Sequence, residues 1–282
     1  MSSGPEGLLL VDKPAAVTSH DVVDAVRRTL GTRRVGHAGT LDPMATGLLL
    51  VGVGRATRLL RFFGALPKAY EGTARLGVET DTLDADGAVV RTSEVRVSTD
   101  EVERAFAALL GQSMQRPPAY SAVKVRGRKL YEAARAGRAL EAPPRPIRVD
   151  EAVVRAVDGT DVEVSVVCSG GTYVRVLIAD VGASLGCGAH LRRLRRTRIG
   201  PYEVTSATRL DALSPPAPIE AAVAHLPRVD LGADEARAAS HGSILAPAGL
   251  SEPYAVFGPD RRLIGIYRDH GAKARPEVIL SG

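Results

Sequence analysis

The stretch on which the prediction of the fold rests runs from Gly36 to Gly47 and reads Gly-His-Ala-Gly-Thr-Leu-Asp-Pro-Met-Ala-Thr-Gly. It is dense in small residues and holds one carboxylate, Asp42. Its glycines allow positive φ angles and a close approach of the backbone to another group. Pro43 fixes its own φ and restricts Asp42 to an extended conformation. A carboxylate with so little freedom is suited to act as a nucleophile or a base.

Local sequence alone leaves two other interpretations of this segment. Asp42 could close an Asx-turn with its own backbone, which is the more common role of an Asp in a glycine-rich loop. A phosphate-binding loop is disfavoured because no Gly-Lys-Ser or Gly-Lys-Thr ending follows and because the carboxylate would repel phosphate. His37 and Thr40 are polar neighbours that could contact a substrate.

The composition limits the class of protein. The length of 282 residues suits two domains or one large domain with an appendage, and 45% hydrophobic residues are enough for a substantial core. Aromatic residues make up only 4% and Trp is absent, so stacking on nucleobases must come from a few Tyr, Phe, His or Arg side chains. The 37 Lys and Arg residues exceed the 32 Asp and Glu residues by 5, which alone is weak support for an anionic partner.

Cysteine usage and the start of the chain favour the cytoplasm. Cys168 and Cys187 are not spaced like metal ligands, so neither a zinc cluster nor a disulfide scaffold is expected, and a reducing compartment fits. The first residues lack a basic segment followed by an apolar one, so no signal peptide is expected. The apolar stretches, such as residues 48–51, are too short to cross a membrane.

Apolar periodicity and turn residues predict both strands and helices. Strands are expected at residues 7–11, 70–76 and 162–168, and helices at 18–30, 99–110 and 173–185, with Thr18-Ser19 and Thr99-Asp100 as helix caps. The apolar run 48–53 fits either a buried strand or a buried helical turn. In the tail, Gly258-Pro259-Asp260 separates two short apolar runs at 255–257 and 263–267, which is a hairpin-like pattern.

Two basic segments could follow the phosphate backbone of a folded RNA. The first is a Pro-rich insertion at about residues 112–150, with one helix expected near 129–136. The second is a cluster without intervening acidic residues, which consists of Arg192, Arg193, Arg195, Arg196 and Arg198. The alternative for both segments is a solvated charged face.

The segment around Asp42 resembles the central motif of the TruB-type pseudouridine synthases, bacterial enzymes that act on the T-loop of tRNA. Further motifs of that family follow in its order. They are Leu10-Val11-Asp12-Lys13-Pro14, Lys68-Ala69-Tyr70-Glu71-Gly72, Arg116-Pro117-Pro118-Ala119-Tyr120, Gly170-Gly171-Thr172-Tyr173-Val174-Arg175 and Leu194-Arg195-Arg196-Thr197. Any one of them is a weak signal, whereas several in the same order over most of the chain are highly specific.

The resemblance implies an α+β protein with the pseudouridine-synthase fold, built on a mixed, mostly antiparallel central sheet. Residues 1–228 are then the catalytic domain, and the insertion at about 112–150 is a thumb that closes on RNA. Residues 229–282 are expected to form a small, β-rich, PUA-like domain that binds RNA. The match of this tail is looser than that of the rest.

The resemblance also implies roles for single residues. Asp42 matches the catalytic carboxylate, Arg175 the arginine that pairs with it, and Tyr70 the tyrosine that stacks on the target uracil. Four further residues match positions that contact the substrate: His37, Lys13, Tyr173 and Leu194. Lys13 could instead brace the loop that holds Asp42, and without the resemblance Tyr70, Tyr173 and Leu194 would be read as core residues.

The implied reaction converts the T-loop uridine of tRNA, at position 55, to pseudouridine without guide RNA. It needs no redox step or energy input, so neither a cofactor nor a metal is expected. The expected partner is the T-arm of tRNA, and the family implies a monomer with no obligatory protein partner. Two alternatives remain: a guide-RNA-dependent synthase of the archaeal and eukaryotic kind, and a non-catalytic protein that binds or folds tRNA.

Overall fold

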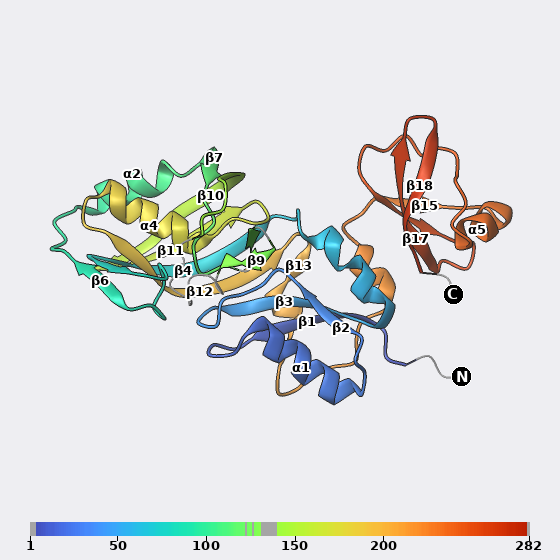
Figure 1. The fold of residues 1–282 in the computed structure, drawn as a ribbon, viewed down its shortest axis with the longest axis horizontal. Helices are drawn as coiled ribbons and strands as arrows, with labels where there is room; N and C mark the ends of the chain where they lie inside the picture. Colours follow the sequence, from blue (N-terminus) through green and yellow to red (C-terminus); the bar gives the residue numbers. More distant parts are fainter. Residues whose placement is uncertain (1–3, 122, 126, 131–139, 281–282) are drawn as a thin grey trace.

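The computed structural model describes residues 4–121, 123–125, 127–130 and 140–280. Figure 1 shows an elongated molecule in which a small C-terminal domain stands at one end of a larger body. The body is built on a ten-stranded sheet, and the C-terminal domain has a four-stranded sheet of its own.

The ten-stranded sheet is mixed. Its strands, in spatial order, are β14 (Thr208–Arg209), β1 (Gly7–Lys13), β3 (Thr46–Val53), β12 (Ala189–Ile199), β4 (Lys68–Leu76), β11 (Asp161–Cys168), β10 (Arg145–Asp158) and β7 (Gly111–Gln115), with β13 (Tyr202–Glu203) beside β12 and β2 (Val35–Ala38) beside β3. The pairs β1–β14 and β3–β12 are parallel, and the others are antiparallel. The predicted mixed, mostly antiparallel sheet is confirmed.

The remaining elements are short. The helices are α1 (Ser19–Leu30), α2 (Thr99–Ala107), α4 (Val174–Ser184) and α5 (Ala233–Ser240), and the 3₁₀ helices are η1 (Gly54–Phe63), η2 (Val204–Ser206) and η3 (Ile219–Val223). Two ribbons pair β5 (Val78–Thr80) with β6 (Val89–Thr92) and β8 (Lys124–Val125) with β9 (Arg128–Lys129). No described helix is long and apolar enough to cross a membrane.

Side-chain caps decide where the first two helices begin. The predicted start of α1 is confirmed, because Thr18 forms a capping box with Asp21, and Gly31 ends the helix in the left-handed conformation. The predicted cap of α2 at Thr99-Asp100 is wrong. Ser98 caps this helix, since only Ser98 lies three residues before Glu101 and can exchange capping hydrogen bonds with it. The helix also ends at Ala107, short of the predicted end at residue 110.

The run 48–53 is a strand, β3, which settles the alternatives that periodicity left open. Its side chains enter two different cores. Leu48 and Leu50 pack with η1 and the C-terminal domain, whereas Leu49 and Val51 pack with α1. Because both faces are covered, the strand shows no alternation of polar and apolar residues.

A third core lies between the sheet and the helices α2 and α4. The strands predicted at 70–76 and 162–168 form β4 and β11 at its centre. The helix predicted at 173–185 is α4, and the predicted apolar face of Val174, Leu177, Ile178 and Val181 is buried. Figure 1 shows α2 and α4 together above this part of the sheet, and α1 below the other part.

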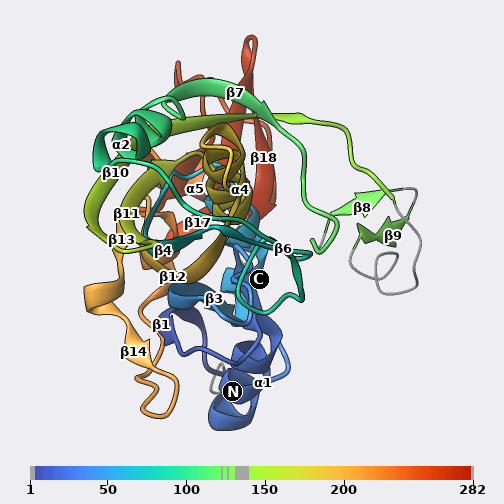
Figure 2. The same ribbon diagram turned by 90° about the vertical axis from the view of Figure 1, so that its left-hand side faces the viewer.

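Both ends of the predicted insertion belong to the central sheet. β7 and β10 pair with each other, so the segment that leaves the sheet runs from 116 to 144. Figure 2 shows the β8–β9 ribbon projecting to one side of the body. Most of the helix predicted at 129–136 lies outside the described residues.

The C-terminal domain joins β15 (Arg228–Asp230), β16 (Tyr254–Phe257), β17 (Leu263–His270) and β18 (Lys273–Ile279). The predicted hairpin is β16–β17. Three arginines of η1 fix this domain to the body: Arg55, Arg58 and Arg61 donate to the backbone carbonyls of Leu280, Ile279 and Glu277. Their spacing of three residues places them on one face, because a 3₁₀ helix has three residues per turn.

Leu59 of η1 is fully buried in the core that the body shares with the C-terminal domain. Leu59→Ala removes packing on both sides of this junction, and we expect it to lower the free energy of unfolding by about 2–5 kcal/mol. Urea unfolding measures the loss. Leu110→Ala is the control, because Leu110 is 51% exposed and its loss should stay within about 0.5 kcal/mol. Equal effects of the two changes would contradict the shared core.

Candidate active site

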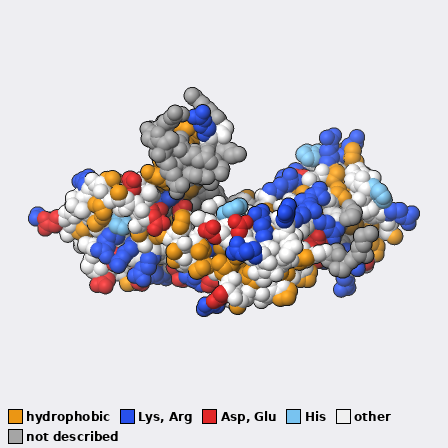
Figure 3. All heavy atoms as spheres, turned by 60° about the horizontal axis from the view of Figure 1, so that its bottom comes forward, with side chains coloured by type: hydrophobic (Ala, Val, Ile, Leu, Met, Phe, Trp, Pro, Cys, Tyr) orange, Lys and Arg blue, Asp and Glu red, His pale blue; other side chains and the backbone are white. Residues whose placement is uncertain are grey.

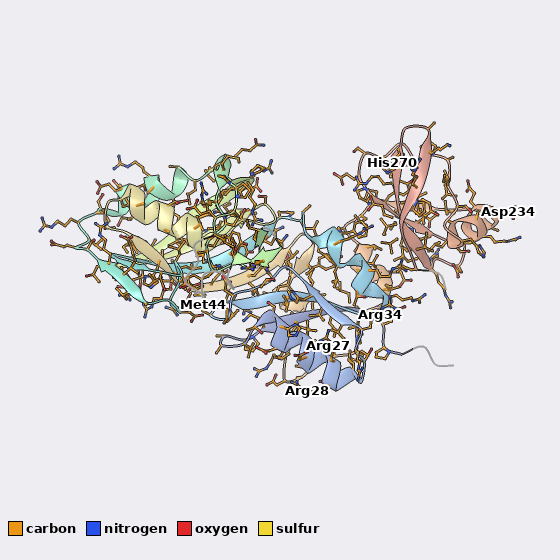
Figure 4. All side chains as sticks on the ribbon, viewed as in Figure 1. Arg27, Arg28, Arg34, Met44, Asp234 and His270 are labelled. Carbon is orange, nitrogen blue, oxygen red and sulfur yellow. The ribbon has the colours of Figure 1, made fainter. Side chains whose placement is uncertain are left out.

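The loop that carries Asp42 connects β2 to β3 and is held from several sides. The Ser19 hydroxyl, at the start of α1, bonds both the backbone N–H and the carbonyl of Leu41. The carbonyl of Pro43 accepts from the backbone N–H of Ala16. The Asp42 carbonyl closes a tight turn by accepting from Ala45 N–H. Figure 4 labels Met44, the tip of this turn, which packs against the core under α4.

Lys13 braces this loop. Its side chain is fully buried, and its Nζ donates to the carbonyls of Pro14, Val17 and Pro43. Burial lowers the pKa of Lys13 to about 8, although the nearby charge of Asp42 opposes that shift. These contacts agree with the alternative of a brace, because the donors of Lys13 are taken up by backbone carbonyls, and the RNA contact expected at Lys13 stays a prediction.

Asp42 faces Arg175, as predicted from the resemblance. Arg175 Nη1 lies 3.4 Å from Asp42 Oδ2, and the Arg175 side chain is only 4% exposed. The Asp42 side chain is 34% exposed, so a substrate can reach it. Among the described residues Asp42 Oδ1 forms neither an ion pair nor a hydrogen bond, and no Asx-turn of Asp42 forms. The carboxylate is thus oriented through one oxygen and free at the other.

A second carboxylate, which the sequence did not single out, shares the same guanidinium. Asp84 Oδ2 lies 3.0 Å from Arg175 Nη1 and is closer to it than Asp42 is. Asp84 Oδ1 accepts from the Thr82 hydroxyl and from the backbone N–H of Asp86. In the sequence, Asp84 belongs to a turn-like stretch, Asp84-Ala85-Asp86-Gly87, and no local pattern indicates that its carboxylate points inward.

Burial raises the pKa of Asp42 above its ordinary value. The guanidinium of Arg175 opposes this rise, and the negative charge of Asp84 adds to it. The ionisation of Asp42 therefore depends on how strongly Arg175 is drawn to each of its two carboxylates.

The start of α4 is tied to the insertion. Tyr173, the residue before α4, has no side-chain cap of its own. Gln115 at the end of β7 holds the backbone of this residue, since its Oε1 accepts from Tyr173 N–H at 2.8 Å and its Nε2 donates to the Tyr173 carbonyl at 3.1 Å. Arg175 Nη2 donates to the carbonyl of Tyr120, also in the insertion, at 2.6 Å. No pattern in the sequence indicated the role of Gln115.

Tyr70 and Leu194 lie on the face of the sheet that is covered by α4. In the β4–β12 pair Tyr70 stands opposite Arg196, and Leu194 stands opposite Gly72. Both side chains belong to the same core as Leu41, beside Asp42. Burial raises the pKa of Tyr70, and the positive charge of Arg196 opposes this. The structure thus brings Asp42, Tyr70, Arg175 and Leu194 to one place.

His37 and Tyr173 lie at the edges of this group. His37 is on β2, and its Nδ1 is buried without a hydrogen-bond partner among the described residues. Burial, with a smaller contribution from Arg196, lowers the pKa of His37 and favours the neutral ring. The ring of Tyr173 has the guanidinium carbon of Arg145 5.1 Å from its centroid and that of Arg175 at 5.7 Å. The described residues contain no group of His, Cys, Asp and Glu side chains that could hold a metal ion.

The arginine cluster of β12 does not form one basic surface, which corrects the prediction. Arg196 is 1% exposed and turned into the core. Arg195 points to the other face and pairs bidentately with Asp12, and Arg192 pairs with Asp161. Successive side chains of a strand point to opposite faces, so five arginines close in sequence cannot all face one RNA.

Comparisons with known proteins agree with this geometry. A profile described as TruB family pseudouridylate synthase, N-terminal domain, matches residues 27–174. The chain belongs to this family. Two C-terminal profiles match the rest: tRNA pseudouridylate synthase B C-terminal domain at residues 175–223, and tRNA pseudouridine synthase II, C terminal, at 226–281. The observed fold is therefore that of the TruB family.

Similar proteins include a tRNA pseudouridine synthase B of Mycolicibacterium paratuberculosis, 48% identical over 98% of both chains. Another, from Thermobifida fusca, is 47% identical over 98% of this chain and 99% of its own. A solved Cbf5-Nop10-Gar1 complex contains a chain that is 26% identical, with a TM-score of 0.75 over 97% of this chain and 84% of that one. An H/ACA RNP bound to a substrate RNA containing 2′-deoxyuridine shares the fold at 24% identity and a TM-score of 0.73.

Asp84 offers a test of the shared ion pair. Asp84→Asn removes a negative charge that raises the pKa of Asp42 and leaves Arg175 to Asp42 alone. The pKa of Asp42 should fall. If Asp42 works as a carboxylate, the rise of kcat/KM with pH on the acidic side then shifts to lower pH.

The pH profile of kcat/KM measures this shift, whatever happens to the maximal rate. Asp86→Asn is the matched control, because Asp86 is exposed and contributes less to the pKa of Asp42. It should move the profile in the same direction but less far. A shift of the Asp84→Asn profile to higher pH would contradict the arrangement.

Proposed function

We propose that this protein converts the T-loop uridine of tRNA, at position 55, to pseudouridine, alone and without guide RNA. The observation that carries the proposal is the Asp42–Arg175 ion pair, with Asp42 one-third exposed, beside Tyr70 and Leu194. Its membership of the TruB family and its relatives named tRNA pseudouridine synthase B support the same reaction.

The reaction breaks the C1′–N1 bond of the uridine, turns the uracil and joins C1′ to C5. C5 loses its proton and N1 gains one, so the overall change is an isomerisation that needs neither an oxidant nor a cofactor. We propose that the free Oδ1 of Asp42 faces the flipped nucleotide while Arg175 holds Oδ2. A carboxylate so placed can attack the sugar or the base, or remove the C2′ proton.

The target base must leave its stack to reach Asp42, and a flat, apolar surface has to replace the lost stacking. We assign this surface to the ring of Tyr70 and to Leu194, which belong to the core beside Asp42. We also assign a substrate contact to His37, whose side chain is half-buried and whose lowered pKa favours the neutral ring. Tyr173 would contact the nucleotide or hold Arg175 from the other side.

The RNA itself needs a positive surface. Figure 3 shows Lys and Arg side chains gathered on one face between the body and the C-terminal domain. Figure 4 labels Arg27, Arg28 and Arg34 around the end of α1. We propose that this face, the exposed part of the insertion and a PUA-like C-terminal domain bind the T-arm. A tRNA substrate also implies the cytoplasm as the place of action.

Three interpretations compete, and one assay separates them. Purified protein is incubated with an unmodified tRNA or a T-arm hairpin, with no other protein or guide RNA, and pseudouridine is detected in the product. A non-catalytic tRNA-binding protein would bind the RNA and form none. A guide-dependent synthase would form none until guide RNA and partner proteins are added.

Within this assay, Asp42→Asn should bind RNA as the wild type does but lower the rate by more than about 10³-fold, because it removes the nucleophile or base. Single-turnover kinetics measure the rate, and filter binding measures the affinity. Asp211→Asn is the control, since Asp211 is exposed and pairs with Arg209 away from the loop. An active Asp42→Asn variant would show that the reaction uses another group.

A further inference from the structure

Arg196 is one of the largest fully buried side chains of the protein, with 1% exposure. Among the described residues no carboxylate pairs with it. Its Nε donates to the carbonyl of Leu48 and its Nη2 to that of Gly39, each at 2.8 Å. A buried charge without a counter-ion is costly unless its donors are satisfied. The fold thus satisfies this cation with backbone carbonyl oxygens.

The two carbonyls belong to the two ends of the Asp42 loop. Gly39 follows β2, and Leu48 lies at the start of β3. One planar guanidinium therefore closes the segment from 39 to 48, with Asp42 inside it. The backbone takes part as well, because Gly47 pairs with Arg196, and a Cβ at Gly47 would lie 2.3 Å from the Arg196 carbonyl oxygen.

A neighbour of the same guanidinium connects the loop to Tyr70. Tyr70 and Arg196 stand opposite each other on β4 and β12, so their side chains share one face. The charge of Arg196 also lowers the pKa of Tyr70 against the effect of burial, which agrees with this closeness. Tyr70 and the two ends of the loop thus meet at one guanidinium.

We propose that Arg196 is a positioning residue for the uridine isomerisation, which fixes the Asp42 loop and the Tyr70 hydroxyl relative to each other from inside the protein. The inference rests on the proposed function. Arg196 was expected to contact a phosphate of the RNA, and the proposed role gives it contacts inside the protein instead. Lys cannot take over the role, because a single ammonium cannot hold two carbonyls that lie in different directions and also lie beside Tyr70, as a planar guanidinium can.

The test compares Arg196→Lys with Arg195→Lys, which makes the same change one residue away on the opposite face of β12. Amide hydrogen exchange of residues 39–48, measured without RNA, should be faster in Arg196→Lys and unchanged in Arg195→Lys. This readout does not depend on catalysis. It decides the loop part of the proposal even if the wild type forms no pseudouridine, a result that would overturn only the proposed function.

Kinetics decide the rest. For Arg196→Lys we expect kcat on tRNA to fall by about tenfold or more, with KM and the salt dependence of RNA binding unchanged. In a Tyr70→Phe background the same change should cost less, because the two residues act together. Arg196→Gln gives a second, uncharged variant. Urea unfolding and circular dichroism of all variants check that the rates refer to folded protein.

Three results would overturn the proposal. Unchanged amide hydrogen exchange of residues 39–48 in Arg196→Lys would show that Arg196 does not hold the two ends of the loop. A salt slope reduced by about one with unchanged kcat would make Arg196 a phosphate contact. Independent, multiplicative effects of Arg196→Lys and Tyr70→Phe on kcat would remove the link to Tyr70.

Discussion

The structure depends on the seating of β12 between β3 and β4. β12 pairs in parallel with β3 through Thr46 and Gly47 and antiparallel with β4, and so joins the part of the sheet under α4 to the part that carries α1. The approach to β3 is so close that Gly47, with φ of +100°, has no room for a side chain. Because the Asp42 loop enters β3 at this junction, the Asp42 carboxylate is positioned by a contact between backbones. Lys13 and Ser19 then fix the loop from the α1 side.

Two buried guanidinium groups flank this loop and are used in different ways. Arg175 is neutralised by Asp42 and Asp84, so its charge orients and balances these two carboxylates. Arg196 is satisfied by backbone carbonyls, and it therefore leaves a positive potential beside Tyr70 and His37. The pKa of Asp42 is still raised, because burial outweighs the help from Arg175. A carboxylate that is destabilised in this way and yet reachable by solvent is suited to react.

Much of the fold could be predicted from the sequence, because local patterns of apolar residues, caps and turns indicate the strands and helices. The capping box at Thr18, the alternation in β11 and the turn between β16 and β17 depend only on neighbours in the chain.

The residues that were missed depend on contacts across long stretches of chain. The sequence shows Asp84 only as a turn residue, because its partner Arg175 lies 91 positions later in the chain. In the sequence Arg196 is a member of a basic run, whereas in the fold the alternation of side chains along β12 turns it into the core. The start of α2 was misplaced because Ser98, Thr99 and Asp100 are all good caps, and both Ser98 and Asp100 have a Glu three residues later, so the local sequence does not distinguish them.

The insertion and the ion pair form one mechanical unit. The insertion leaves the sheet from β7 and returns at β10, and each root contacts the segment that carries Arg175: Gln115 holds Tyr173, and Arg145 donates to Gly171. Within the insertion, Tyr120 offers its carbonyl to Arg175 itself. The guanidinium is therefore held at three points, by Tyr120, Asp84 and Asp42, and the longest of these contacts, 3.4 Å, is the one to Asp42. A displacement of Tyr120 would shift Arg175 relative to its two carboxylates, and the pKa of Asp42 would change with it. The insertion and the Asp42 carboxylate are thus connected through a single side chain.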